Sequence, residues 1–401
     1  MPATDKAVTD KFISAGIAKI DRMIGSLARK FFMIKVPVEN NKIMFMTYRN
    51  DYDCNPKYIA ERILEEGLPY DLVWAVPGKG SMKKGNFPSE IRRVRRGSFE
   101  FYQELASAHI WVDNSLNCVW TPVPKKKEQV YIETWHGSMG LKRVGNNDVK
   151  NKRWLKAAKR ATSRVDYCIS DSMFENQVYR ETHWPTAEIL EYGHPRNDIL
   201  VDLDEEKRRL LKERVAEMLE FDLEAKVLLY APTFRDSGTL ECYDIDFERL
   251  FDALKKRFGG DWVVLYRLHF HDRNKLPDLD ESLPMIDATG YLDMQELLAI
   301  ADAGITDYSS WCCDYVLTGR PCFIYARDLE SYNTERGLYY PLEETPFPIA
   351  TDNEELEQAI LSFDEERYLE DRDEFLRARG CWEDGHAAEK VVEKIKEIIG
   401  E

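Results

Sequence analysis

Residues 99–115, FEFYQELASAHIWVDNS, change from a helical pattern to the pattern of a buried strand within one short segment. The strand part, AHIWVDN, is nearly continuous in apolar residues and runs into a polar loop. Strands that are buried on both faces are typical of parallel sheets covered by helices. The segment therefore predicts an α/β fold.

The same alternation of strands and helices extends along the chain in both directions. The strand-like segments of a first series include NKIMFMTYRND (41–51), PYDLVWAVPG (69–78), QVYIETWHGS (129–138) and the start of VDYCISDSMFENQVYRET (165–182). An acidic helical stretch at 202–221 follows, and a second series contains AKVLLYAPTFRD (225–236), DWVVLYRLHFHD (261–272), LLAIADAGITDYSS (297–310) and RPCFIYARD (320–328). Two such series predict two doubly wound α/β domains with a boundary between 193 and 225. A final helix, HAAEKVVEKIKEIIG (386–400), fits either domain.

The composition narrows the class of protein. The 401 residues are 44% hydrophobic and 32% charged, which suffices for two apolar cores. The net charge of −16 argues against a general nucleic-acid binder, which needs a basic surface. Eight cysteines without CxxC spacing indicate reduced core thiols of a cytosolic protein rather than a zinc site or a disulfide framework. The first residues are polar, and no apolar run is long enough to cross a membrane, so we expect neither a secretory signal nor a membrane-spanning helix.

Positive charge is concentrated in one part of this acidic chain. Residues 83–164 carry 18 Lys or Arg against 7 Asp or Glu, with clusters at 91–96, 125–127 and 150–160. A single cluster of this kind is usually a solvated helix face, but three together favour a surface that meets anionic lipid or a phosphate-bearing substrate. Residues 7–35 have the pattern of an amphipathic helix, which either packs on its own domain or lies in a membrane interface.

Informative residues follow the predicted strands, where ligands bind in open α/β sheets. His136 comes directly after QVYIETW, and Gly137, Gly140, Lys142 and Arg143 follow it. A histidine in this place has the chemistry of a general base near neutral pH, although local hydrogen bonds alone could also explain it. Glycines allow backbone N–H groups to approach an anion, and the basic residues add charge.

Two loops of the second series suggest phosphate binding. The strand VVLYRLH delivers Arg267 and His269, which suit a phosphate, and we give little weight to a metal at the His-x-His pair. Ser309 and Ser310 stand where a helix N-cap belongs, which is either an anion site or an ordinary cap. The chain has no GxxxxGK[ST], GxGxxG or GxSxG pattern, which argues against P-loop, NAD-dependent and serine-hydrolase chemistry.

Six motifs in order carry a resemblance to a known family. They are TWHGSMGLKRVG (134–145), YGHPRNDIL (192–200), LYAPTFRD (229–236), YRLH (266–269), ITDYSSWCCDY (305–315) and YNTERGLYY (332–340). The NPK helix start (55–57), the AHIWVDN strand (108–114) and DGHAAEK (384–390) fit as well. The chain resembles the CDP-glycerol glycerophosphotransferases, the primases and polymerases of teichoic acids.

This resemblance implies a GT-B-like fold with two facing Rossmann-like domains, and we expect an amphipathic helix at 1–36, an acceptor domain at 37–200 and a CDP-donor domain at 201–401. It implies transfer of a polyol phosphate from CDP-glycerol or CDP-ribitol to an acceptor hydroxyl, with release of CMP. His136 matches the proposed general base, and His269 matches a second histidine on the donor phosphates. The implied donor-side residues are Thr233, Arg235, Arg267, Thr306, Asp307, Ser309, Ser310, Asp314, Arg336 and Gly337. The expected acceptor-side residues are Gly137, Ser138, Lys142 and Arg143. No DxD-like pair lies beside the donor loops, so we expect no protein-held metal and no other cofactor.

The chain departs from the family pattern in two places. Ser138-Met139 replaces Thr-Pro, with an extra Gly140, and His194 replaces the usual tyrosine of Gly-Tyr-Pro. Because proline would stiffen the loop, acceptor positioning is expected to differ here. We assign His194 to the interdomain connection rather than to catalysis.

Several points stay open at this stage. The short N-terminal region favours a primase or a compact surface-polymer transferase over a long-chain polymerase, with a lipid-linked acceptor and attachment to the cytoplasmic face of the membrane. The polyol, the acceptor and the oligomeric state are not decided. The alternatives are a GT-B glycosyltransferase that uses a nucleotide sugar and a scaffold without activity, and the retention of His136 and His269 counts against the scaffold.

Overall fold

The computed structural model describes residues 35–48, 51–78, 87–117, 125–143, 152–235, 244–268, 282–335 and 337–401. The predicted helix at 7–35, apart from its last residue, lies outside these ranges. So do two predicted site residues, His269 and Arg336.

The described part of the first domain is built on a seven-stranded parallel sheet with strand order β3-β2-β1-β4-β5-β6-β7. Its strands are β1 (Glu39–Met46), β2 (Asp71–Val76), β3 (Arg92–Arg95), β4 (Ala108–Asp113), β5 (Val130–Glu133), β6 (Tyr167–Ser170) and β7 (Glu188–Glu191). Its helices are α2 (Cys54–Glu65), α3 (Phe99–Ser107), α4 (Lys152–Thr162) and α5 (Met173–Glu181). The chain winds outward from β1 to β3 and returns beside β1 as β4, so the order reverses between β1 and β4.

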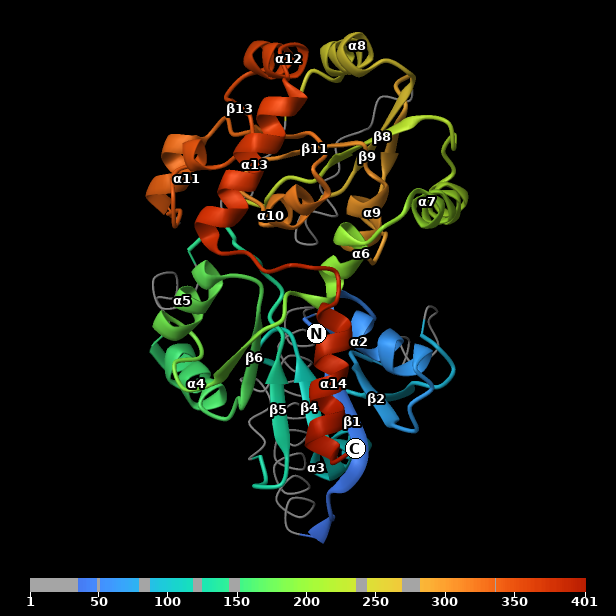
Figure 1. The fold of residues 1–401 in the computed structure, drawn as a ribbon, viewed down its shortest axis with the longest axis vertical. Helices are drawn as coiled ribbons and strands as arrows, with labels where there is room; N and C mark the ends of the chain where they lie inside the picture. Colours follow the sequence, from blue (N-terminus) through green and yellow to red (C-terminus); the bar gives the residue numbers. More distant parts are fainter. Residues whose placement is uncertain are drawn as a thin grey trace, which may run out of the picture.

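The second domain repeats the plan with a six-stranded parallel sheet, in the order β10-β9-β8-β11-β12-β13 among the described residues. Its strands are β8 (Lys226–Tyr230), β9 (Trp262–Tyr266), β10 (Met285–Asp287), β11 (Ala303–Thr306), β12 (Cys322–Tyr325) and β13 (Ile349–Ala350). Its helices are α6 (Asp198–Val201), α7 (Glu205–Leu219), α8 (Phe247–Phe258), α9 (Met294–Ile300), α10 (Trp311–Tyr315), α11 (Leu329–Glu335), α12 (Asn353–Leu361) and α13 (Glu365–Arg379), with 3-10 turns η5 (Val316–Thr318) and η6 (Leu342–Glu344). The 3-10 turn η2 (Pro195–Asn197) ends the first domain and leads into α6. Figure 1 shows this domain above the first.

The sequence explains why these elements form. Every residue of β4 is buried, which matches its continuous apolar run between helical layers. The helices begin at polar caps: the Ser98 hydroxyl accepts a hydrogen bond from the Phe101 N–H at the start of α3, and the Asp204 carboxylate accepts one from the Lys207 N–H at the start of α7. The predicted pair of doubly wound domains is confirmed.

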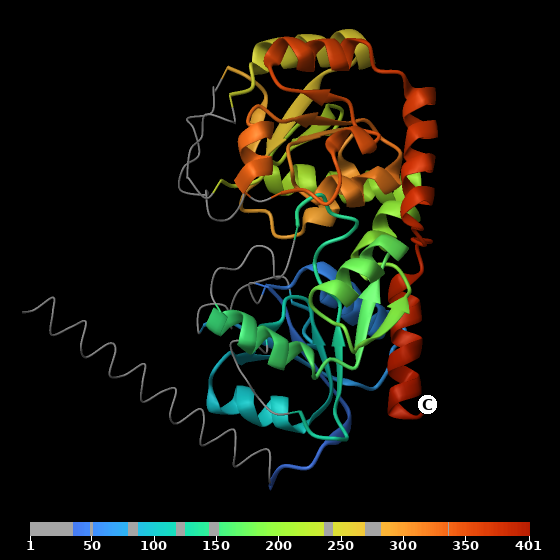
Figure 2. The same ribbon diagram turned by 90° about the vertical axis from the view of Figure 1, so that its left-hand side faces the viewer.

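The last helix, α14 (Ala387–Ile399), packs on the first domain and not on the second. Val391, Val392 and Ile395 are fully buried against the core of the first sheet, beside Ile59 of α2. In Figures 1 and 2, α13 lies against the second domain and the chain then passes down to α14. Among the described residues, the chain therefore passes from the first domain to the second at η2 and returns to the first between α13 and α14.

One basic cluster differs from its expected form. Residues 92–95 form the edge strand β3 rather than a helix face. Arg92 bonds the carboxylates of Asp71 and Glu104 through its Nε and Nη atoms. A strand fits because Val94 is buried while Arg95 is exposed, an alternation with the period of a strand. Part of the basic charge in this region is therefore already paired within the domain.

Candidate active site

The carboxyl ends of the central strands of the two sheets meet at a cavity of about 260 Å³. Residues of the first domain that line it include Tyr48, Asp53, Cys54, His136 and Arg196. Residues of the second domain include Arg267, Thr289, Gln295, Ser309, Ser310 and Asp314. A larger hollow of about 760 Å³ lies beside Ala225 and Trp262, where strands of the second sheet begin, and it contains none of the predicted site residues. The interdomain cavity is therefore the candidate active site.

His136 lies three residues beyond the end of β5, and its ring is exposed to the cavity. Its Nδ1 lies 2.5 Å from the carbonyl oxygen of Asn114, which can only accept a hydrogen bond. The proton of the neutral ring is therefore on Nδ1, and Nε2 carries the lone pair that a base needs. Crowding by the surrounding protein lowers the pKa of His136 to about 4, and the positive charge of Arg196 adds to this effect. His136 is thus unprotonated at neutral pH.

The turn that carries His136 is tightly constrained. Trp135 has a positive φ of 52°, which is unusual for a side chain of this size. A Cβ on Gly137 would come within 2.9 Å of the Trp135 indole nitrogen, and a Cβ on Gly140 within 3.2 Å of the Ser310 Cβ. A side chain at either glycine would therefore require its neighbour to shift, and Gly140 marks the place where the loop meets the second domain.

Beyond Gly140 the loop enters the second domain. Met139 and Leu141 are fully buried in the apolar core of that domain. The Arg143 Nε donates to the Leu338 carbonyl at 3.0 Å, and Lys142 pairs with Leu338 as an antiparallel bridge. Lys142 and Arg143, predicted on the acceptor side, thus lie at an interdomain contact, and their acceptor role stays a prediction.

The predicted donor-side residues fall into two groups. Arg267, Ser309, Ser310 and Asp314 line the cavity. Ser310 is at the N-cap position of α10, as expected, but its side chain makes no capping hydrogen bond within the described helix.

The second group forms a network behind the cavity wall. Arg235 is buried and bridges the carboxylates of Asp307 and Asp328 at 2.8 and 2.6 Å. Asp307 also accepts the Thr233 N–H, and the Thr306 hydroxyl donates to the Ala231 carbonyl. These residues shape the loops after β8 and β11. Gly337 has a φ of 74°, and its carbonyl accepts the Arg143 N–H.

Sequence reasoning missed a buried polar network that joins the domains. The Arg196 guanidinium makes a two-point contact with Asp314, at 3.1 and 3.0 Å. The side-chain amides of Asn197 and Gln295 also donate to Asp314. Arg196 lies in the motif YGHPRNDIL, so its place in an ordered motif was the available signal, but nothing in the sequence pairs it with Asp314.

A second missed contact lies at the start of α2. Lys57 Nζ is 2.5 Å from Asp293 and 2.9 Å from Glu296, both at the start of α9. Burial works against the charge of Lys57, but Asp293, Glu61 and Glu296 outweigh it and raise the lysine's pKa. The lysine of the NPK segment (55–57) therefore forms an ion-pair contact with the second domain, which the sequence motif alone did not reveal.

Among the described residues, one buried group has the composition of a metal site: Asp171, Glu175 and His194, with one ligand atom from each within 4.8 Å of the others. A neutral histidine that binds a metal through Nε2 carries its proton on Nδ1 and needs an acceptor there. The His194 Nδ1 instead faces the side-chain NH₂ of Asn55 at 3.3 Å. The orientation of the Asn55 amide is fixed because its side-chain oxygen accepts a hydrogen bond from the backbone N–H of Arg196. The donor set therefore does not fit a metal held through His194.

Two facing doubly wound domains, with a histidine and an arginine at the cavity between them, are typical of the GT-B fold. Residues 28–397 match the family model described as CDP-glycerol:poly(glycerophosphate) glycerophosphotransferase, and the chain belongs to this family.

Several relatives of this chain are named as enzymes of teichoic acid synthesis. The chain is 32% identical over 380 residues to the teichoic acid poly(glycerol phosphate) polymerase of Staphylococcus epidermidis, covering 91% of this chain and about half (52%) of that protein. It is 30% identical to the teichoic acid glycerol-phosphate transferase of Staphylococcus aureus, covering 92% of this chain and 96% of the relative. The solved structure of the wall teichoic acid polymerase TagF matches with a TM-score of 0.81 at 29% identity, over 100% of this chain and 98% of that chain.

These findings confirm the predicted family, the GT-B-like fold and the prediction of an enzyme that transfers a polyol phosphate from a CDP-activated donor. None of the described helices combines the length and the apolar character that spanning a membrane requires.

Proposed function

We propose that this chain transfers glycerol phosphate from CDP-glycerol to an acceptor hydroxyl and releases CMP, during synthesis of a teichoic acid or a related surface polymer. The observation that carries the proposal is His136, held as an unprotonated ring at the interdomain cavity, with its Nε2 unbonded by any residue that the structure describes. Glycerol is favoured over ribitol because relatives named for glycerol phosphate are 28–32% identical to this chain, whereas those named for ribitol phosphate are 26–29% identical.

In the proposed reaction, the acceptor hydroxyl gives its proton to His136 Nε2 while its oxygen attacks the β-phosphorus of the donor. The bond from the β-phosphorus to the bridging oxygen breaks, and that oxygen leaves with CMP. Arg267 supplies a fixed positive charge at the cavity for the donor phosphates. His269, proposed as a second phosphate contact, follows β9 directly after Leu268, which lines the cavity.

We assign the acceptor to the first domain (37–200) and the CDP group to the second (201–401), with α14 returning to the first. Ser309, Ser310 and Arg267 are proposed donor contacts, and Arg235 acts behind them by fixing the loops after β8 and β11. The donor then lies across the cavity from His136.

A lipid-linked acceptor at the cytoplasmic face of the membrane completes the proposal. Lys156, Lys159 and Arg160 are exposed on α4 and offer positive charge to an anionic surface. Sedimentation with vesicles that contain anionic lipid, at low and high salt, tests this attachment. Binding that is lost on deletion of residues 1–35 supports it, and absence of binding at low salt contradicts it.

The length of the chain does not separate a primase from a polymerase. A poly(glycerol phosphate) polymerase of Bacillus spizizenii matches over 90% of this chain and 93% of its own length. The number of units added is therefore a property to be measured on the product.

The test is CMP release from CDP-glycerol, CDP-ribitol and a UDP-sugar, each with and without a lipid-linked or synthetic glycerol-phosphate acceptor. We expect acceptor-dependent release from CDP-glycerol, unaffected by EDTA. Release only from CDP-ribitol would change the polyol, and turnover of the UDP-sugar alone would overturn the proposal.

A further inference from the structure

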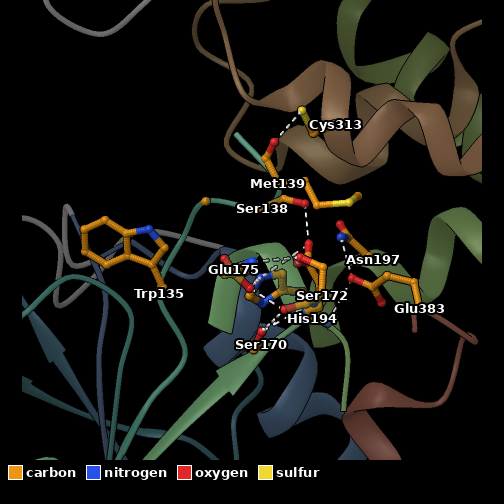
Figure 3. A network of polar contacts seen from close by, with 12 residues as sticks. Trp135, Ser138, Met139, Ser170, Ser172, Glu175, His194, Asn197, Cys313 and Glu383 are labelled. Carbon is orange, nitrogen blue, oxygen red and sulfur yellow. Dashed lines mark hydrogen bonds and ion pairs between the residues drawn. The ribbon is translucent and has the colours of Figure 1, made fainter. Parts of the chain in front are cut away.

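A fully buried group of polar side chains lies directly behind the turn that carries His136. His194 and Asp171 have no exposed surface, and Glu175 is 2% exposed. In Figure 3 the His194 ring lies beside Glu175, with Ser138 above them and Asn197 and Glu383 to their right. The mechanism above uses none of the buried ionisable groups in this cluster.

One nitrogen of the His194 ring is linked to the residues just before His136. The side-chain NH₂ of Asn55 lies 3.3 Å from His194 Nδ1 and donates to the carbonyls of Thr134 and Trp135 at 3.0 and 3.2 Å. The proton of the neutral His194 ring is therefore on Nε2, because Nδ1 faces a donor. Asn55 thus joins His194 to the amino-terminal side of the turn.

The other nitrogen faces the carboxylates that hold the residues just after His136. His194 Nε2 lies 3.0 Å from Glu175 Oε2 and 3.8 Å from Asp171 Oδ2. Asp171 Oδ2 accepts a hydrogen bond from the Ser138 hydroxyl, and the Asp171 N–H donates to Glu175. His194 Nε2 makes no hydrogen bond with a described residue, so the ring meets these carboxylates by close packing. The two sides of the turn are therefore connected across a single imidazole, by Asn55 on one side and by packing against the carboxylates on the other.

The protonation states support this arrangement. Burial raises the pKa of Glu175 to about 7 and also raises that of Asp171, next to the negative Glu175. Burial lowers the pKa of His194 to about 4, with Arg196 adding to the effect and Asp171 and Asp314 opposing it. The pKa of Glu383, whose carboxylate accepts a hydrogen bond from the backbone N–H of His194, is raised too. A neutral His194 with a proton on Nε2 is thus the form that fits between Asn55 and the carboxylates.

We propose that His194 is a positioning residue for the transfer reaction: with Asn55, Asp171 and Glu175 it forms a buried clasp that fixes the turn Thr134–Ser138 and thereby places His136. The clasp rests on the proposed role of His136 as the base. Ser138 and His194, two of the residues at which the chain departs from the family pattern, both lie against Asp171 in this clasp.

The clasp makes a specific kinetic prediction. A displacement of about 1 Å at a catalytic group lowers turnover by up to about a hundredfold without a comparable effect on binding. Loss of the clasp therefore lowers kcat and leaves KM for CDP-glycerol nearly unchanged, because the donor residues lie on the other domain.

The experiment compares His194→Phe, which keeps a ring and removes both nitrogens, with His194→Gln, which keeps a polar amide in place of the imidazole. Ser138→Ala and the double variant are measured beside them. Asn176→Ala is the control. Asn176 lies next to Glu175 on α5, and its side chain bonds Glu191 of β7, so the variant loses a buried polar contact outside the clasp. The readouts are kcat and KM for CDP-glycerol and the melting temperature.

We expect His194→Phe and Ser138→Ala each to lower kcat about tenfold or more with KM within about twofold, and His194→Gln to recover most of the loss. The double variant should lose little more than either single one, because both act through Asp171. If His194→Phe does not fold, Ser138→Ala and His194→Gln carry the test. Unchanged kcat, or a loss no larger than that of the control at equal melting temperature, overturns the clasp. Absence of CMP release from the unmodified enzyme would instead refute the proposed function.

Discussion

The buried pair of Arg196 and Asp314 is expected to contribute strongly to the coupling between the domains. Their side chains are 3% and 8% exposed, and the pair crosses the cavity from η2 to α10. Arg196→Met removes the cation and its contact with the Gly137 carbonyl, and leaves Asp314 with two amide donors. Removing one partner of a buried pair costs about 3–5 kcal/mol, and the two remaining donors place the expected loss near the lower end.

A double-mutant cycle with Arg196→Met and Asp314→Leu measures the pair itself. Each single variant should lose about 3 kcal/mol in the free energy of unfolding, which shifts a urea midpoint by about 1 M. The double variant removes both charges and should lose much less than the sum, giving a coupling energy of about 2–4 kcal/mol. The assay is urea unfolding followed by tryptophan fluorescence and by circular dichroism.

The control is an exposed pair of the same charge type, Arg209 and Glu213 on α7, with 58% and 36% of the side chains exposed. Its coupling energy should stay below about 0.5 kcal/mol. A coupling energy for Arg196 and Asp314 as small as that of the control would refute the reasoning. Urea transitions that separate for the two probes in Arg196→Met would show the domains unfolding independently.

Three further predictions follow from the same geometry. Lys57→Met leaves Asp293 and Glu296 without their interdomain cation and should lower the free energy of unfolding by about 2–4 kcal/mol, measured by urea unfolding. Burial raises the pKa of Glu175 to about 7 in the folded state, whereas the unfolded chain loses this proton near pH 4.5, so the stability of the unmodified protein falls across this window. The raised pKa of Asp171 adds to the fall. Glu175→Gln removes the contribution of Glu175 and should gain about 1–3 kcal/mol relative to the unmodified protein between pH 4.5 and 8, and a constant difference would contradict this. If His136 is the base, as proposed, kcat/KM should fall only as the pH approaches about 4, whereas a limb near 6.5 would mean an unperturbed histidine.

Much of the fold could be predicted from the sequence because burial in a parallel sheet leaves a clear pattern. Strands such as β4 and β9 are continuous apolar runs between helices, and the residues that follow them reach the ligand-binding edge. This rule located His136, Arg267 and Ser309 at one cavity. The basic strand β3 was not foreseen, because Arg92–Arg95 is four residues long and its pairing with β2 is a tertiary contact.

The remainder of the site depends on contacts between distant residues. Asp314 pairs with Arg196, 118 positions away, and Lys57 with Asp293, 236 positions away. Such pairs leave no local pattern, since each residue alone reads as an ordinary charged side chain. The sequence placed His194 at the interdomain connection, and in the structure it contacts Asn55 and Glu383. Its link to the turn of His136 could be found only in the structure.

The most direct test of the central claim is CMP release from CDP-glycerol by the unmodified chain and by His136→Ala, with and without acceptor, alongside binding of CDP-glycerol by calorimetry. If His136 is the base, the variant should bind the donor with nearly unchanged affinity and lose acceptor-dependent release by about 10²–10⁴-fold. A His136→Ala variant that binds the donor and turns over at the rate of the unmodified chain would contradict the account.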